Sequence, residues 1–214
     1  MFDLHCHSVF SDGELIPAEI WQRVKVLGYI AIAITDHADQ SNYEFIITNL
    51  LKIKEALRGL TPQLLVGVEL THVPPHLIPE LIPKARNLGA EIVIVHGETI
   101  VEPVAAGTNR AAILGGADIL AHPGLISEEE VNLAKEKGVF LELSGRRGHS
   151  LTNGHVARLA LKHGVPLVIN SDAHSPSDLL TPDLAFKIAL GAGLTKEEVE
   201  NLWKLAQRRF LKSP

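Results

Sequence analysis

The stretch EIVIVHGETIVEPVAAGTNRAAILGGADILAHPG, residues 91–124, contains one complete unit of a pattern that repeats along this chain. Glu91–Val95 is a short apolar run rich in β-branched residues, which predicts a buried strand. Pro103–Leu114 has a helical pattern, and Asp118–Ala121 is the next predicted strand. A histidine directly follows each strand, His96 after the first and His122 after the second. The stretch therefore predicts a strand–helix–strand unit whose strands end in polar groups.

The same unit recurs on both sides of this stretch. Further strands are predicted at Phe2–Cys6, Ile30–Thr35, Leu64–Val68, Val139–Leu143 and Leu167–Asn170. Further helices are predicted at Pro17–Leu27, Ser41–Leu57, His76–Leu88, Ser127–Lys137, Asn153–His163, Asp183–Leu190 and Thr195–Leu211. This regularity indicates parallel strands joined by right-handed crossovers. No glycine-rich nucleotide loop follows any strand, which favours a barrel over an open doubly wound sheet. We expect one α/β domain over residues 1–214.

The composition limits the classes of partner. The 214 residues carry a net charge of −5, so no broad basic surface favours nucleic acid, although the charge does not exclude it. The one cysteine, Cys6, excludes an intramolecular disulfide and suggests a reducing compartment. We find no signal-peptide pattern and no apolar run long enough for a bilayer, and we therefore predict a cytoplasmic protein with no membrane partner. The eleven histidines are unusual for a chain of this kind.

Polar residues gather at the carboxyl ends of the predicted strands, where parallel βα proteins collect their functional groups. In chain order these residues are His5, His7 and Asp12, then Asp36 and His37, Glu69, His96, His122, Glu142 with Arg146 and Arg147, and Asp172 with His174. His5 and His7 share one face of their strand, whereas Cys6 points away and is expected to be a small buried hydrophobe. The coincidence of so many histidines and carboxylates at strand ends predicts a metal centre.

The motifs at these positions resemble those of the PHP family (polymerase and histidinol phosphatase domains). They are HCH and SDG within residues 5–13, TDH at 35–37, GVE at 67–69, VHGE at 95–98, AHPG at 121–124 and SDAH at 171–174. The similarity runs from the first strand to the last and covers nearly the whole chain. It implies a distorted barrel of seven (β/α) units that holds up to three metal ions and hydrolyses phosphate esters.

The resemblance also implies which residues hold the ions. His5, His7, Glu69 and Asp172 would hold one ion, and Glu69 would bridge to a second ion held by His96 and His122. A third ion would lie between His37, His174 and a group from the first loop, where some members have a histidine and this chain has Asp12. Imidazole and carboxylate ligands without a thiolate suit zinc, manganese or iron. We therefore expect two or three divalent transition-metal ions.

Other residues are expected to act around the ions. Clustered divalent ions activate water and can clamp the oxygens of a phosphoryl group, whose charge Arg146 or Arg147 would neutralise. His174, Asp36 and a water molecule are the candidates for the proton donor. Glu142 is expected to orient a ligand histidine. His72, in the loop after Glu69, is a candidate for substrate contact or for a structural role.

We predict metal-dependent hydrolysis of a phosphate ester, with a small-molecule phosphomonoester such as histidinol phosphate as the substrate. A nuclease or nucleotide phosphodiesterase is the first alternative. A metal-dependent amidohydrolase is the second, because clustered metals in a barrel also hydrolyse C–N bonds. A metal-stabilised interaction module without catalysis is the third. The sequence does not define the substrate, the number of ions or the oligomeric state.

Overall fold

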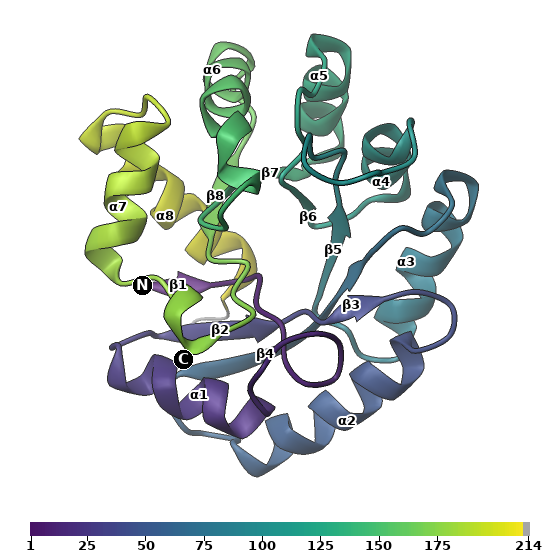
Figure 1. The fold of residues 1–214 in the computed structure, drawn as a ribbon, viewed down its shortest axis with the longest axis vertical. Helices are drawn as coiled ribbons and strands as arrows, with labels where there is room; N and C mark the ends of the chain where they lie inside the picture. Colours follow the sequence, from purple (N-terminus) through teal and green to yellow (C-terminus); the bar gives the residue numbers. More distant parts are fainter. Residues whose placement is uncertain (212–214) are drawn as a thin grey trace.

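The strands form a nearly closed parallel barrel with the helices on its outside (Figure 1). The computed structural model describes residues 1–211. Neighbouring strands follow the order β1-β2-β4-β5-β6-β7-β8. The short β3 is not part of this order and pairs with β4. The strands are β1 (Phe2–Asp3), β2 (Ala31–Ile34), β3 (His37–Ala38), β4 (Gln63–Leu70), β5 (Ile92–His96), β6 (Ile119–Ala121), β7 (Phe140–Ser144) and β8 (Leu167–Asn170). The predicted barrel of seven strand–helix units is confirmed.

Eight α-helices connect and flank the strands within the described residues. They are α1 (Pro17–Val26), α2 (Tyr43–Ala56), α3 (Ile78–Asn87), α4 (Thr108–Gly115), α5 (Glu128–Lys137), α6 (Asn153–His163), α7 (Pro182–Gly191) and α8 (Lys196–Phe210). A capping box begins the last helix: the Thr195 side chain accepts from the backbone N–H of Glu198, and the Glu198 carboxylate accepts from the backbone N–H of Thr195. None of the helices in residues 1–211 has the length and apolar character that a membrane crossing requires.

Helix α4 begins later than the sequence pattern predicts, at Thr108 instead of Pro103. The Glu98 side chain accepts hydrogen bonds from the backbone N–H groups of Gly107 and Asn109, and these bonds satisfy donors at the start of the helix. Residues 97–107 therefore form a loop above the end of β5. This loop carries Glu102 into the candidate site.

Side chains along each strand alternate between the barrel interior and the helical layer, as a pleated strand requires. On β5, Ile92 and Ile94 belong to the interior cluster, whereas Val93 and Val95 belong to the larger cluster beneath the helices. Helix α8 covers the amino-terminal end of the interior, where Phe210 lies with its ring 4.9 Å from that of Phe140. The amino-terminal end of the barrel interior is therefore filled with apolar side chains, and polar side chains occupy the carboxyl end of the strands.

A seam between the two ends of the chain closes the barrel. The backbone N–H of Asp172 donates to the carbonyl of His5 at 3.0 Å, and that of His7 donates to the carbonyl of Ala173 at 2.9 Å. Cys6 and Ala173 form a parallel bridge at the same place. The seam puts the residues after β1 directly beside those after β8.

The first strand is shorter than predicted, because Asp3 interrupts it. One Asp3 carboxylate oxygen accepts from the backbone N–H of His5 at 3.1 Å, and the other accepts from that of Ser171 at 3.1 Å. This bend changes which residues face inward. Leu4 belongs to the interior cluster, yet His5 also reaches the candidate site, and Cys6 packs in the outer core as expected.

Candidate metal centre

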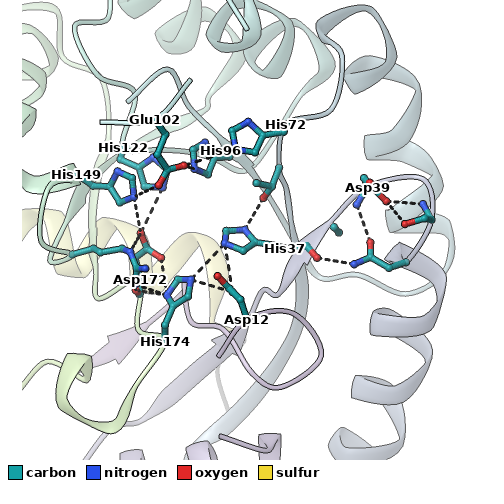
Figure 2. A pocket seen from close by; sticks show the side chains of 15 residues that line it. Asp12, His37, Asp39, His72, His96, Glu102, His122, His149, Asp172 and His174 are labelled. Carbon is teal, nitrogen blue, oxygen red and sulfur yellow. Dashed lines mark hydrogen bonds and ion pairs between the residues drawn. The ribbon is translucent and has the colours of Figure 1, made fainter. Parts of the chain in front are cut away.

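A pocket of about 510 Å³ opens at the carboxyl ends of the strands and is lined mainly by imidazoles and carboxylates (Figure 2). Its walls come from the loops that follow β1, β2, β4, β5, β6, β7 and β8. The lining residues are Asp12, His37, Ala38, Asp39, Ser41, Asn42, Thr71, His72, His96, Glu102, His122, Arg146, His149, Asp172 and His174. His5, His7 and Glu69 lie beneath them, completely or almost completely buried.

The backbone explains how side chains from separate strands converge here. Glu69 and His96 continue the inward-facing sets that begin with Leu65 on β4 and Ile92 on β5. His122 does not follow the alternation on β6, since Ala121 already faces inward. A φ of 27° at His122 and of 53° at Asp172 places both residues in the left-handed region. Strained backbone of this kind gathers at functional sites, where the surrounding structure holds it.

The first group of candidate ligands joins the two ends of the chain. His7 Nε2 lies 3.2 Å from Asp172 Oδ1, and His5 Nε2 lies 3.7 Å from the same oxygen and 3.4 Å from Glu69 Oε1. Two donors on one tetrahedral zinc ion are separated by about 3.4 Å, because each lies about 2.0–2.1 Å from the metal. The spacing of these atoms therefore suits a shared ion.

Glu69 lies between all the groups of candidate ligands. Its Oε1 is 3.4 Å from His5 Nε2 and 3.5 Å from His122 Nε2, so one oxygen faces two groups at once. Its Oε2 lies 2.7 Å from His37 Nδ1. Burial alone would raise the pKa of Glu69, but the surrounding His5 and His37 hold it well below its ordinary value. A buried, ionised carboxylate in this position can bridge two cations.

A further group of candidate ligands, Asp12, His37 and His174, is more open to solvent. His174 Nε2 lies 3.2 Å from Asp12 Oδ1 and 3.4 Å from His37 Nε2 (Figure 2). The Asp12 side chain is 55% exposed, whereas that of His174 is 11% exposed. Asp12 therefore lies at the rim of the pocket, beside two candidate ligand histidines.

Several buried side-chain nitrogen and oxygen atoms have no hydrogen-bond partner within residues 1–211, and this observation tests whether metal ions fit the site. These atoms are His5 Nε2, both ring nitrogens of His7, Glu69 Oε1 and His122 Nδ1. An unpartnered buried polar atom is costly, so such a cluster requires an explanation. Divalent ions among the rings and carboxylates would supply partners for the atoms that face the centre. The residues present fit the metal centre that the motifs imply.

Glu142 fixes the orientation of His5 from behind. Its Oε1 accepts from His5 Nδ1 at 2.8 Å and from Asn170 Nδ2 at 2.7 Å, and its Oε2 accepts from the backbone N–H of His122 at 3.1 Å. A proton on Nδ1 leaves the Nε2 lone pair of His5 free to face the centre. This contact is the one that the sequence analysis expected of Glu142.

Other predicted residues lie apart from this cluster or at its edge. Asp36 is buried outside the pocket lining and accepts from the Ser8 N–H and hydroxyl and from the Ser11 hydroxyl. Burial raises the pKa of Asp36 despite those hydrogen bonds. Asp36 therefore anchors the loop that carries Asp12. Glu98, from the VHGE motif, caps α4 and does not line the pocket.

The two arginines after β7 have different positions. Arg146 lines the pocket and donates through Nη1 to His174 Nδ1 at 2.6 Å and to the carbonyl of Asp172 at 3.2 Å. Arg147 is exposed and does not belong to the lining. Of the two alternatives for a phosphate contact, Arg146 is the one that faces the cavity.

Two residues of the site were missed by the sequence analysis, Glu102 and His149. Glu102 Oε2 lies 3.0 Å from His96 Nε2, and this bond holds the pKa of Glu102 down at about 2. His149 stacks on His122 with ring centroids 4.0 Å apart. A histidine shortly after a strand end was a usable signal for His149. Glu102 gave none, because it lies just before the helix predicted from Pro103 and belongs to none of the motifs.

The barrel and this arrangement of imidazoles and carboxylates define the class of protein. The sequence profile of the PHP domain matches residues 3–163, and the chain belongs to this family. An uncharacterized protein of Methanocaldococcus jannaschii is 53% identical over 203 residues, which span 94% of this chain and 93% of that protein. The ribonuclease P protein component 3 of Methanosarcina mazei is 28% identical over 99% of this chain and 88% of its own. A probable phosphatase of Thermoanaerobacter sp. strain X514 is 27% identical over 94% of this chain and 90% of its own.

Two solved structures have the same fold. A chain in archaeal ribonuclease P with mature tRNA has a TM-score of 0.66 and 19% identity, over 100% of this chain and 94% of that chain. The histidinol phosphate phosphatase of Lactococcus lactis, determined with zinc, L-histidinol and phosphate, has a TM-score of 0.62 and 15% identity, over 91% and 94%. At these identities the likeness concerns the fold.

Proposed function

We propose that this chain is a metal-dependent phosphoesterase that hydrolyses small-molecule phosphomonoesters such as histidinol phosphate. The observation that carries the proposal is the convergence of nine candidate ligands in one centre, several of whose buried nitrogen and oxygen atoms have no hydrogen-bond partner among residues 1–211. The ligands proposed are His5, His7, Asp12, His37, Glu69, His96, His122, Asp172 and His174. They would hold two or three ions of zinc, manganese or iron, since imidazoles dominate and no thiolate takes part.

The bound ions would supply an activated water and neutralise the charge that develops on the phosphoryl group. The protein's own residues would position the ester. Arg146 would direct its guanidinium to the phosphoryl oxygens, and its planar fork suits two oxygens at once. His174 would direct its Nε2 toward the cavity as a ligand and would have no proton there, so a water molecule is the proposed proton donor to the leaving alkoxide. Asp36 would act from behind by holding the Ser8–Asp12 loop.

The shape and charge of the pocket support a small substrate. Among the described residues that line it, Arg146 is the only lysine or arginine, whereas Asp12, Asp39, Glu102 and Asp172 are acidic. One arginine and several cations suit a terminal phosphate dianion. Tight binding of a long polyanion depends instead on many lysine and arginine contacts. The relative named as a probable phosphatase agrees with this proposal.

An RNA-associated role is the second candidate, because relatives named ribonuclease P protein component 3 match nearly the whole chain. The protein would then contribute a surface to an RNA–protein particle, or its centre would act on nucleic acid as a nuclease. The net charge of −5 and the acidic pocket wall weigh against this candidate. The amidohydrolase alternative ranks below both the phosphoesterase and the RNA-associated role. A cytoplasmic location stays a prediction.

The deciding experiment is a substrate screen on chelator-treated protein reloaded with zinc, manganese or iron(II). Phosphate release would be measured on histidinol phosphate and other monoesters, on a diester and on a single-stranded oligonucleotide. His7→Asn, which removes a buried candidate ligand, provides the inactive control for contaminating phosphatases. We expect kcat/KM to be far higher on monoesters. Stepwise degradation of the oligonucleotide, without turnover of any monoester, would make the nuclease the better assignment. Binding of structured RNA without any hydrolysis would favour a role as a surface in an RNA–protein particle.

A further inference from the structure

Beside the nine proposed ligands, the pocket wall contains Glu102 and His149, two residues that the family motifs do not include. The Glu102 carboxylate lies between two rings, with Oε2 3.0 Å from His96 Nε2 and Oε1 3.3 Å from His149 Nε2. The His149 ring lies nearly parallel to that of His122, at an interplanar angle of 15°. Figure 2 shows these four side chains on the same side of the cavity, apart from Asp12 and His174.

The fold holds His149 in this place. Its Nδ1 makes a 2.8 Å hydrogen bond with the Thr99 hydroxyl, and the side chain is only 4% exposed. Thr99 and Glu102 belong to the β5–α4 loop, and His149 begins the 3₁₀ turn η2 (His149–Thr152) after β7. The two loops pack together at Val101 and Gly148. A Cβ atom added to Gly148 would lie 3.5 Å from the Val101 side chain. Glu102 and His149 are therefore brought together by tertiary packing.

The separations of these atoms suit a common cation. One nitrogen each from His96, His122 and His149 lies within 4.8 Å of the other two. The gaps of 3.0 and 3.3 Å from Glu102 to His96 and His149 are close to the spacing of about 3.4 Å between donors on a tetrahedral ion. A ring that ligates through Nε2 has no proton there. The Glu102 oxygen would then face the lone pair of His96, unless an ion joins the two.

We propose that His149 and Glu102 are additional ligands of the ion that His96 and His122 would hold. This inference rests on the proposed metal-dependent function. It adds to that function by assigning a different set of ligands to each ion. The ion at this position would lie among three imidazoles, with the carboxylates of Glu69 and Glu102 as further ligands. Imidazole suits zinc and iron, whereas manganese prefers carboxylate and water. We therefore assign this position to zinc in preference to manganese.

The test measures metal binding directly, independent of any substrate. The full chain, freed of metal, would be titrated with zinc and with manganese against a chromophoric chelator. The variants are His149→Ala and Glu102→Gln. His155→Ala and Glu129→Gln are the matched controls, because His155 binds the carbonyl of Ile126 outside the pocket and Glu129 pairs with Arg110 at the surface. We expect each pocket variant to bind one zinc ion at least about tenfold more weakly, and the controls to match the unaltered chain.

A second readout separates a ligand from a residue that only positions its neighbours. Cobalt(II) can replace zinc, and its visible spectrum reports the number and type of ligands. His149→Ala should change that spectrum, and the preference for zinc over manganese should shrink. Unchanged zinc affinity in both variants would overturn the inference. A weaker affinity with an unchanged cobalt spectrum would overturn it as well, by showing that the residues act indirectly.

The outcome is separable from that of the proposed function. If the cobalt and zinc results hold but no phosphate ester is hydrolysed, the ligand assignment stands and the phosphoesterase proposal fails. If esters are hydrolysed but the two variants bind metal normally, the phosphoesterase proposal stands and the ligand assignment fails. Glu102 is 38% exposed, so Glu102→Gln is expected to fold, and it keeps the test decisive if His149→Ala does not.

Discussion

Glu142 accepts a hydrogen bond from His5 at 2.8 Å, across 137 positions of the sequence. The same carboxylate accepts from Asn170 and from the backbone of His122, so one buried side chain ties together three strand ends. A glutamine at this position would present an amide nitrogen to at least one of these donors. Glu142→Gln should therefore lower zinc affinity by about 10–100-fold while the barrel stays folded. Zinc titration together with circular dichroism would check this, and wild-type affinity would mean that His5 needs no such partner.

Glu69→Gln should be more damaging, because the proposed bridge between two ions needs both ionised oxygens. We expect loss of bound metal and a fall in kcat of at least about 10²-fold, on the scale of losing a group that stabilises the transition state. Metal content by mass spectrometry and turnover on a monoester are the measurements. Glu129→Gln at the surface is the control. A Glu69→Gln protein with normal metal content would show that Glu69 does not bridge.

Metal binding should release protons. Burial lowers the pKa of His5, but the carboxylates of Glu142, Glu69 and Asp172 raise it well above its ordinary value. The ring of the metal-free protein therefore keeps its proton at neutral pH, and an ion must displace it. Zinc affinity should rise with pH, and calorimetry at pH 7 in buffers of different ionisation enthalpy should show at least about one proton released per chain. A pH-independent affinity would mean that the His5 ring is already neutral.

Arg146→Ala and Arg147→Ala should differ, although the two residues are neighbours. Arg146 lines the pocket, and Arg147 is exposed outside it. Removal of a ground-state phosphate contact should raise KM for a monoester, by roughly tenfold, with a smaller effect on kcat. Arg147→Ala should leave both constants unchanged. Steady-state kinetics on one monoester would check the pair, and equal effects would exclude Arg146 as the specific contact.

Cys6 should be dispensable for the chemistry. Its side chain packs in the outer core, on the other side of the chain from His5 and His7. Cys6→Ala should keep its metal and its turnover per folded molecule, and it should cost about 1 kcal/mol of unfolding free energy through lost packing. Denaturant unfolding and metal analysis are the measurements. Loss of metal in Cys6→Ala would show that the thiol side faces the centre.

The sequence predicted the barrel and the clustering of polar strand ends because both follow from local pattern. Alternating apolar residues mark the strands, and Glu69 and His96 continue their inward faces. The finer arrangement depends on backbone that no periodicity describes. His122 reaches the pocket through a positive φ, and Asp3 bends the chain so that Leu4 and His5 can both face inward.

Long-range packing accounts for what the sequence missed. Nothing near His149 indicates that its ring is held by Thr99, which is 50 positions away. Glu102 lies just before the helix predicted from Pro103 and belongs to no motif. Its loop is longer than predicted because Glu98 caps α4, which begins at Thr108. Such contacts exist only once the two loops have packed together.

The seam between His5, His7 and the residues after β8 also dictates when the first proposed ion site can form. During synthesis, His5 and His7 leave the ribosome before β2 to β8, whereas Asp172 and His174 follow only after these strands. A nascent chain thus carries half of its first proposed ion site well before Asp172 can complete it. Ion capture would then coincide with the last step of barrel assembly, and a chain interrupted before Asp172 would lack that centre.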